Sequence, residues 1–74
     1  MFNVQYRETS GGSAMDELDS NDRRHLVLHL ACFTRPIIAV FENGTPITKT
    51  ARFELRKWPG TKTQFADNFA RFQD

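Results

Sequence analysis

Apolar and polar residues alternate at the start of the chain, where polar residues separate Phe2, Val4 and Tyr6. Alternation with a period of two is typical of a strand that buries one face. A second run, Ile37–Phe41, is rich in β-branched and aromatic residues, which fit the pleated surface of a sheet. We therefore expect a strand at each of these two places.

An Asn-Gly pair separates the second run from another strand-like segment, Ile47–Trp58. A two-residue loop between antiparallel strands needs a positive φ angle at both central positions, and Asn43-Gly44 adopts such angles at little steric cost. Pro46 has no N–H to donate to a sheet and marks the beginning of the return strand. The pattern predicts a β-hairpin whose second strand runs from Ile47 to Trp58.

Residues 8–22 contain Gly11-Gly12 and then an acidic stretch with few apolar side chains. A segment with so little surface to bury is typical of a mobile loop. We therefore expect a flexible acidic loop over residues 8–22. A single helical turn capped by Ser13 is the alternative for part of it.

The segment Arg24–Phe33 fits either a strand or a helix. As a strand, it places every second residue on one face, namely Leu26, Leu28, Leu30 and Cys32. As a helix capped by Ser20, with Asp22 near its start, it would spread apolar residues almost all round. Because the strand separates the two faces more cleanly, we favour the strand, which Pro36 then ends.

Three phenylalanines, Phe65, Phe69 and Phe72, recur at helical spacing near the end of the sequence, after a capping segment at residues 61–63. A lone helix and a lone hairpin are each unstable in water, so we expect them to bury each other. The sequence thus predicts an α+β fold in one domain over residues 1–74. It consists of a small antiparallel sheet of three to four strands with a C-terminal amphipathic helix packed on one face.

The chain has 74 residues and one cysteine, so no disulfide can form within it. A chain without disulfides fits a reducing compartment. The first residues lack the basic start and apolar run of a signal peptide, and no segment approaches the roughly 20 apolar residues that span a bilayer. We expect a soluble cytoplasmic protein.

His25, His29 and Cys32 belong to the residue types that bind zinc. On the favoured strand the two histidines would lie roughly 13 Å apart, which is too far for one metal ion. We therefore expect structural or surface histidines and a buried thiol. The chain also lacks the glycine patterns that bind nucleotides, and its serines lie in loop-like regions. The sequence predicts no metal, no cofactor and no enzymatic activity.

Charge is unevenly distributed along a chain whose formal net charge is +1. Residues 14–22 carry four carboxylates and no base, whereas residues 49–62 carry five bases and one carboxylate. A chain with this distribution can present two electrostatically different faces.

The basic return strand is the strongest candidate for a binding site. Alternation would turn Phe53 and Leu55 inward under the C-terminal helix and their neighbours outward to solvent. Arginine and tryptophan are enriched among the residues that dominate binding energies. The residues expected to contact a partner are Arg52, Arg56, Lys57 and Trp58, supported by Arg23 and Arg24.

This strand face suits contact with a larger host protein complex. Direct nucleic-acid binding, in which arginine contacts phosphate and an aromatic ring stacks on a base, is the alternative. The carboxylate of Glu54 interrupts the basic row and argues against a track for phosphates. A solvated face without a partner, and self-association through a strand edge or the aromatic helix, also fit these residues.

The segment Ile38–Ile47 resembles the central hairpin of a small phage anti-CRISPR family that acts on type I-F surveillance complexes. Phe2–Tyr6 is similar to the opening strand of that family. The resemblance implies a short, non-enzymatic phage protein that binds and redirects host machinery, with CRISPR complexes and RNA polymerase as targets and Tyr6 as a contact residue. At Phe41 the family presents a tyrosine, and near Arg52 basic character replaces a family glutamate.

Overall fold

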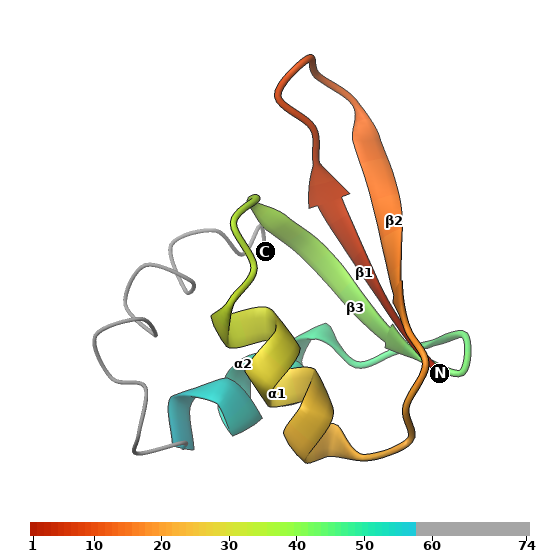
Figure 1. Ribbon diagram of the computed structural model, residues 1–74, viewed down its shortest axis with the longest axis vertical. Helices are drawn as coiled ribbons and strands as arrows, with labels where there is room; N and C mark the ends of the chain where they lie inside the picture. The colour runs from red at the N-terminus through yellow and green to blue at the C-terminus, as the bar shows by residue number, and fades with distance from the viewer. Residues whose placement is uncertain (58–74) are drawn as a thin grey trace.

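The computed structural model describes residues 1–57, which form an antiparallel sheet and two helices (Figure 1). In chain order the elements are β1 (Phe2–Arg7), β2 (Ser13–Leu18), α1 (Arg23–Ala31), β3 (Ile37–Glu42), β4 (Thr45–Pro46) and α2 (Thr48–Lys57). The strand order across the four-stranded sheet is β2-β1-β3-β4, and all neighbours are antiparallel. The predicted α+β fold with a small antiparallel sheet is confirmed. The predicted C-terminal helix lies outside the described residues.

Both helices pack on the same face of the sheet (Figure 1). One face of β1 and β3 supplies the floor of the core, because Val4 lies opposite Val40 and both are buried. Helices α1 and α2 pack over these residues and complete the core. The buried core consists of Phe2, Val4, Leu26, Val27, Leu30, Ala31, Ile37, Val40, Ala51 and Leu55. Within residues 1–57, no further layer covers the other face of the sheet.

The hairpin at Asn43-Gly44 is confirmed. Asn43 has a φ angle of 50° and Gly44 one of 85°, which are the left-handed values that such a turn requires. The turn joins β3 to β4 with Glu42 opposite Thr45 and Phe41 opposite Pro46. The two strands are therefore joined by the two-residue turn that the sequence predicted.

The predicted return strand from Ile47 to Trp58 is wrong, because Thr48–Lys57 forms helix α2. The hydroxyl of Thr48 accepts a hydrogen bond from the N–H of Val40 at 3.0 Å, where a longer strand would have continued the ladder. The N–H of Ala51 then donates to the C=O of Ile47 at 2.8 Å, which starts the helix. Burial of Ala51 and Leu55, four residues apart, holds one side of α2 against the core.

The preference for a strand over Arg24–Phe33 is also wrong, because Arg23–Ala31 forms helix α1. Asp22 caps the helix, and its side chain accepts a hydrogen bond from the N–H of Arg24 at 2.9 Å. The buried stripe consists of Leu26, Val27, Leu30 and Ala31. This stripe has helical spacing and leaves Leu28 on the outside, so the alternating leucines do not share a face.

The expected loop over residues 8–22 contains strand β2, which pairs with β1 along its whole length. Gly11 and Gly12 have φ angles of 92° and 78°, and they let the chain reverse direction between the strands. Ala14, Asp16 and Leu18 lie opposite Tyr6, Val4 and Phe2, on the helix-covered side. Asp16 is polar but occupies an inward-facing position, so the sequence of this strand does not show the usual alternation of apolar and polar residues.

We predict that Leu30→Ala and Leu28→Ala have very different effects on stability. Leu30 is 0% exposed and Leu28 is 49% exposed. Removing a buried leucine side chain costs about 2–5 kcal/mol, whereas a surface change of this kind usually costs about 0.5 kcal/mol or less. Urea denaturation of the two variants measures the difference. Equal losses in both would mean that the two leucines share a face, as in a strand.

Candidate functional site

The structure places the predicted contact residues on two helices and on no strand. Arg23 and Arg24 lie in the first turn of α1, whereas the other described members, Arg52, Arg56 and Lys57, lie on α2. Trp58 lies outside the described residues. Because residues 48–57 are helical, the strand face that alternation predicted does not exist.

Phe53 and Leu55 lie on opposite sides of α2 and do not turn inward together. Leu55 is fully buried in the core, but the Phe53 side chain is 59% exposed. Positions two apart on a helix point in different directions, whereas positions three and four apart share a side. The expectation that both residues are core residues is therefore wrong for Phe53.

One side of α2 combines an aromatic ring with cations. Lys49, Arg56 and Lys57 lie four before, three after and four after Phe53, so all of them share its side of the helix. All four residues are exposed. The ammonium nitrogen of Lys57 lies 5.0 Å from the centre of the Phe53 ring, within the range of a cation–π contact. We call Lys49, Phe53, Arg56 and Lys57 the α2 outer face.

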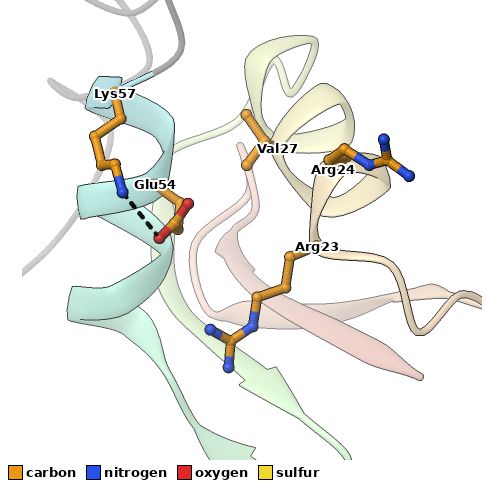
Figure 2. A pocket seen from close by; sticks show the side chains of 5 residues that line it. All are labelled: Arg23, Arg24, Val27, Glu54 and Lys57. Atoms are coloured by element: carbon orange, nitrogen blue, oxygen red, sulfur yellow. Dashed lines mark ion pairs between the residues drawn. The ribbon is translucent and has the colours of Figure 1, made fainter.

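A shallow groove of about 250 Å³ lies between α1 and α2 (Figure 2). Five residues line it, namely Arg23, Arg24, Val27, Glu54 and Lys57. The structure thus brings three of the predicted contact residues to one groove. Glu54 lies across the groove from the arginines and contacts Lys57, with 3.8 Å between the ammonium nitrogen and the carboxylate oxygen.

The two arginines of this groove are already paired with carboxylates of the same chain. Arg23 donates from two nitrogens to Glu42 at 3.0 and 3.4 Å, which ties the start of α1 to the end of β3. Arg24 donates to the capping carboxylate of Asp22 at 3.0 Å, and Figure 2 shows its side chain pointing away from α2. An incoming anion would have to compete with these pairs. We therefore leave Arg23 and Arg24 out of the binding surface proposed below.

These pairs shift the ionisation of their members. The hydrogen bonds from the Arg24 side chain and backbone lower the pKa of Asp22, and the hydrogen bond from Arg23 lowers the pKa of Glu42. The same contacts raise the pKa values of the two arginines. Both carboxylates are therefore charged over a wider pH range than an isolated carboxyl group.

The two histidines hydrogen-bond to neighbouring side chains. His29 contacts Asp16 at 2.5 Å and joins α1 to β2, and His25 contacts the hydroxyl of Ser20 at 2.9 Å. Cys32 is exposed, so the expectation of a buried thiol is wrong. Within residues 1–57, no set of three or more His, Cys, Asp or Glu side chains is arranged to hold a metal ion.

Tyr6, which the resemblance implied as a contact residue, is half-buried at a second shallow hollow. Its ring makes an edge contact with Phe33 at 5.4 Å between centroids, and the guanidinium of Arg35 lies 6.0 Å from its centre. The other lining residues are Asp16, Cys32 and Thr34. The hollow is lined by residues of both charges, Asp16 and Arg35.

Charge divides the described molecule into two regions. The helices α1 and α2 carry six lysine and arginine residues against the single carboxylate of Glu54. Strand β2 and the link to α1, residues 13–22, carry four carboxylates and no lysine or arginine. The sequence predicted an acidic stretch over residues 14–22 and a basic one over residues 49–62. It did not predict that the described residues of the basic stretch lie on a helix or that the acidic stretch begins in a strand at the edge of the sheet.

Sequence reasoning missed Phe53 and Lys49 as surface residues. The signal that could have found them is the four-residue step from Ala51 to Leu55, which predicts one buried side of a helix. On that helix, Lys49 and Phe53 share the other side. The strand pattern of the same segment concealed this signal.

Comparison with protein families, with curated proteins and with solved structures finds no match to this chain. Neither helix among residues 1–57 has the length and apolar character needed to cross a membrane.

We predict that the paired carboxylates Asp22 and Glu42 make stability depend on acid. Because their pKa values are lowered in the folded state, the stability that they contribute is present above the ordinary carboxyl pKa of about 4. It is lost as the pH falls through the lowered values. The double variant Asp22→Asn, Glu42→Gln keeps a capping side chain but removes both titrations.

Thermal unfolding between pH 7 and pH 2 measures this effect. The midpoint of the double variant should fall less over this range than that of the original chain. Glu17→Gln, which removes an exposed carboxylate of β2, is the matched control. An identical pH profile for the original chain and the double variant would contradict the role of the two pairs.

Proposed function

We propose that this chain is a small, non-enzymatic binding module that docks the α2 outer face onto an acidic surface of a larger protein assembly. The observation that carries the proposal is the exposure of Phe53 amid the side chains of Lys49, Arg56 and Lys57. By occupying that surface, the module would modulate the assembly to which it binds.

A single exposed apolar residue is common on protein surfaces, so the argument depends on the combination. Phe53 is the most exposed of the large apolar residues in the described part of the chain. A phenylalanine that enters a pocket on a partner contributes apolar burial, whereas surrounding cations speed and orient the encounter with an acidic surface. The α2 outer face offers both contributions on one rigid helix.

The spacing of the α2 outer face matches recognition of a helix by a groove. Lys49, Phe53, Arg56 and Lys57 occupy positions i, i+4, i+7 and i+8. Side chains at this spacing enter one groove together when a helix lies along it. The partner surface that fits is an apolar pocket for the ring with carboxylates on its rim.

The same residues could contact a nucleic acid, which is the alternative that the sequence left open. Two observations favour a protein partner. The formal net charge of the chain is +1 with an isoelectric point of about 8.0, whereas a domain that binds nucleic acid is typically more basic, with a value above about 9. The exposed carboxylates of Glu17 and Asp19 would also repel a phosphate backbone.

The kind of assembly in this proposal comes from the resemblance of Ile38–Ile47 to the hairpin of a phage anti-CRISPR family. Assemblies of the host cell with extended charged surfaces, such as a CRISPR surveillance complex or RNA polymerase, are the proposed targets. The surface argument for α2 does not depend on that identification.

We expect Phe53→Ala and Lys49→Glu each to abolish partner binding while the chain stays folded. Affinity capture from nuclease-treated lysate of the cells that produce this chain identifies the partner, and titration of the purified partner measures affinity. Loss of a central aromatic residue typically costs about 2 kcal/mol or more, which is about 30-fold in affinity. Lys49→Glu places a carboxylate at the N-terminal end of α2, where the helix dipole favours it.

Leu28→Ala is the matched control, because Leu28 is an exposed apolar residue on the other helix. It should capture the same partner with unchanged affinity. Equal capture by all four chains, or no captured protein at all, would contradict the proposal. Capture that disappears after nuclease treatment would favour direct binding of nucleic acid instead.

A further inference from the structure

Strand β2 lies at an edge of the sheet, with β1 as its neighbour on one side. No element within residues 1–57 pairs with its other side. A strand in this position presents a row of backbone donors and acceptors to any extended segment that can pair with it.

The hydrogen bonds at the end of β1 show which backbone groups of β2 face outward. The N–H of Arg7 donates to the C=O of Pro36 at 2.9 Å, so the backbone groups of Arg7 face β3. In an antiparallel pair the direction alternates from residue to residue. The β2 residues opposite Arg7, Gln5 and Asn3 therefore turn their N–H and C=O groups away from the sheet. These residues are Ser13, Met15 and Glu17.

The edge of β2 has few of the features that usually prevent such pairing. Short length, proline and bulges protect edge strands. Strand β2 has six residues, contains no proline and pairs with β1 without a shift in register. The opposite edge differs, because β4 has two residues and one of them is Pro46. What protects β2 is charge, from Asp16 on the helix-covered side and Glu17 on the open side.

We propose that β2 is a docking strand that pairs with an extended basic segment of a partner protein, as a fifth strand of the sheet. Charge complementarity selects this occupant. Strand β2 carries Asp16 and Glu17 and no lysine or arginine, and Glu17 is exposed on the open side, so lysine or arginine opposite Glu17 forms a favourable cross-strand pair. A second copy of β2 would bring no lysine or arginine to this edge.

The contact between His29 and Asp16 holds the middle of β2 in place before any partner binds. His29 holds the Asp16 side chain against α1 at 2.5 Å, which fixes the middle of β2 to the helical layer. A strand that is already ordered loses little conformational entropy when a segment pairs with it. The docking strand is therefore formed before its partner arrives.

This proposal is independent of the α2 outer face. The two surfaces have opposite charge, lie on different elements and share no residue. One of them can fail its test while the other passes. A partner that offers an acidic surface and a basic tail would engage both.

The probe for the test is a short synthetic peptide of alternating lysine and valine, and a peptide of alternating glutamate and valine is its counterpart. Binding of the full chain is measured by NMR titration, together with hydrogen exchange of the backbone amides. The lysine peptide should bind and should slow exchange at the outward N–H groups of Ser13, Met15 and Glu17. The glutamate peptide should not bind.

Three variants separate backbone pairing from charge. Met15→Pro removes one outward N–H without removing a bond to β1, so it should weaken binding at least tenfold. Met15→Thr keeps that N–H and should bind like the original chain. Glu17→Lys should lower affinity for the lysine peptide and raise affinity for the glutamate peptide, and it tests the proposal even if Met15→Pro fails to fold.

Three results would overturn the inference. The first is the same affinity for both peptides, and the second is unchanged binding by Glu17→Lys. The third is protection at residues outside β2 with none at its outward amides. Sedimentation of the full chain at several concentrations completes the test, since a dimer that Met15→Pro abolishes would identify a second copy as the occupant of this edge.

Discussion

One apolar core, formed where two short helices bury one face of the sheet, determines which side chains of this chain remain outside. The core includes four residues of α1, namely Leu26, Val27, Leu30 and Ala31. From α2 it includes only Ala51 and Leu55. Two features hold α2 in place, namely the burial of these two side chains and the hydrogen bond from the N–H of Ala51 to the C=O of Ile47. Every other side chain of α2 is therefore placed outside or at the margin of the core, and Phe53 is among them.

The two proposed binding surfaces follow from this single layer of helices. The side of α2 that faces away from the core is exposed, and it carries an aromatic ring with three cations. A small sheet also has two edge strands. Here Pro46 limits further pairing at β4, whereas the carboxylates of Asp16 and Glu17 limit it at β2. The basic helical layer and the acidic strand give opposite fields to different parts of one small molecule. Partners of opposite charge can then bind without competing for the same residues.

The parts of the fold that local chemistry determines could be predicted from the sequence. Asn43-Gly44 needs only its own φ angles to specify a hairpin, and the alternation of β1 is uninterrupted. The predictions of a strand were wrong for two segments, residues 48–57 and Arg24–Phe33, because the apolar residues of each segment fit both a strand and a helix. Residues 48–57 read as an alternating strand and also as a helix with a four-residue step, and the short apolar run of α1 is similarly ambiguous. Packing against the sheet decides between such patterns, and packing is not local.

The difference between local chemistry and packing also explains which residues of the candidate site could be predicted. The basic character of Arg56 and Lys57 was visible in composition, and both residues are exposed on α2. The direction of Phe53 depends on whether the segment is a strand or a helix, so it could not be predicted while that choice was wrong. Strand β2 was missed because Asp16 stands in its inward row, where only the position of His29 accounts for a carboxylate.

The most direct test of this account is the set of backbone Cα and Cβ chemical shifts over residues 48–57 in the full chain. We expect helical shifts without interruption from Thr48 to Lys57, which place Leu55 inward and Phe53 outward. Extended-strand shifts over the same residues would contradict the account, because they would remove the α2 outer face and restore the sheet that the alternating pattern predicted.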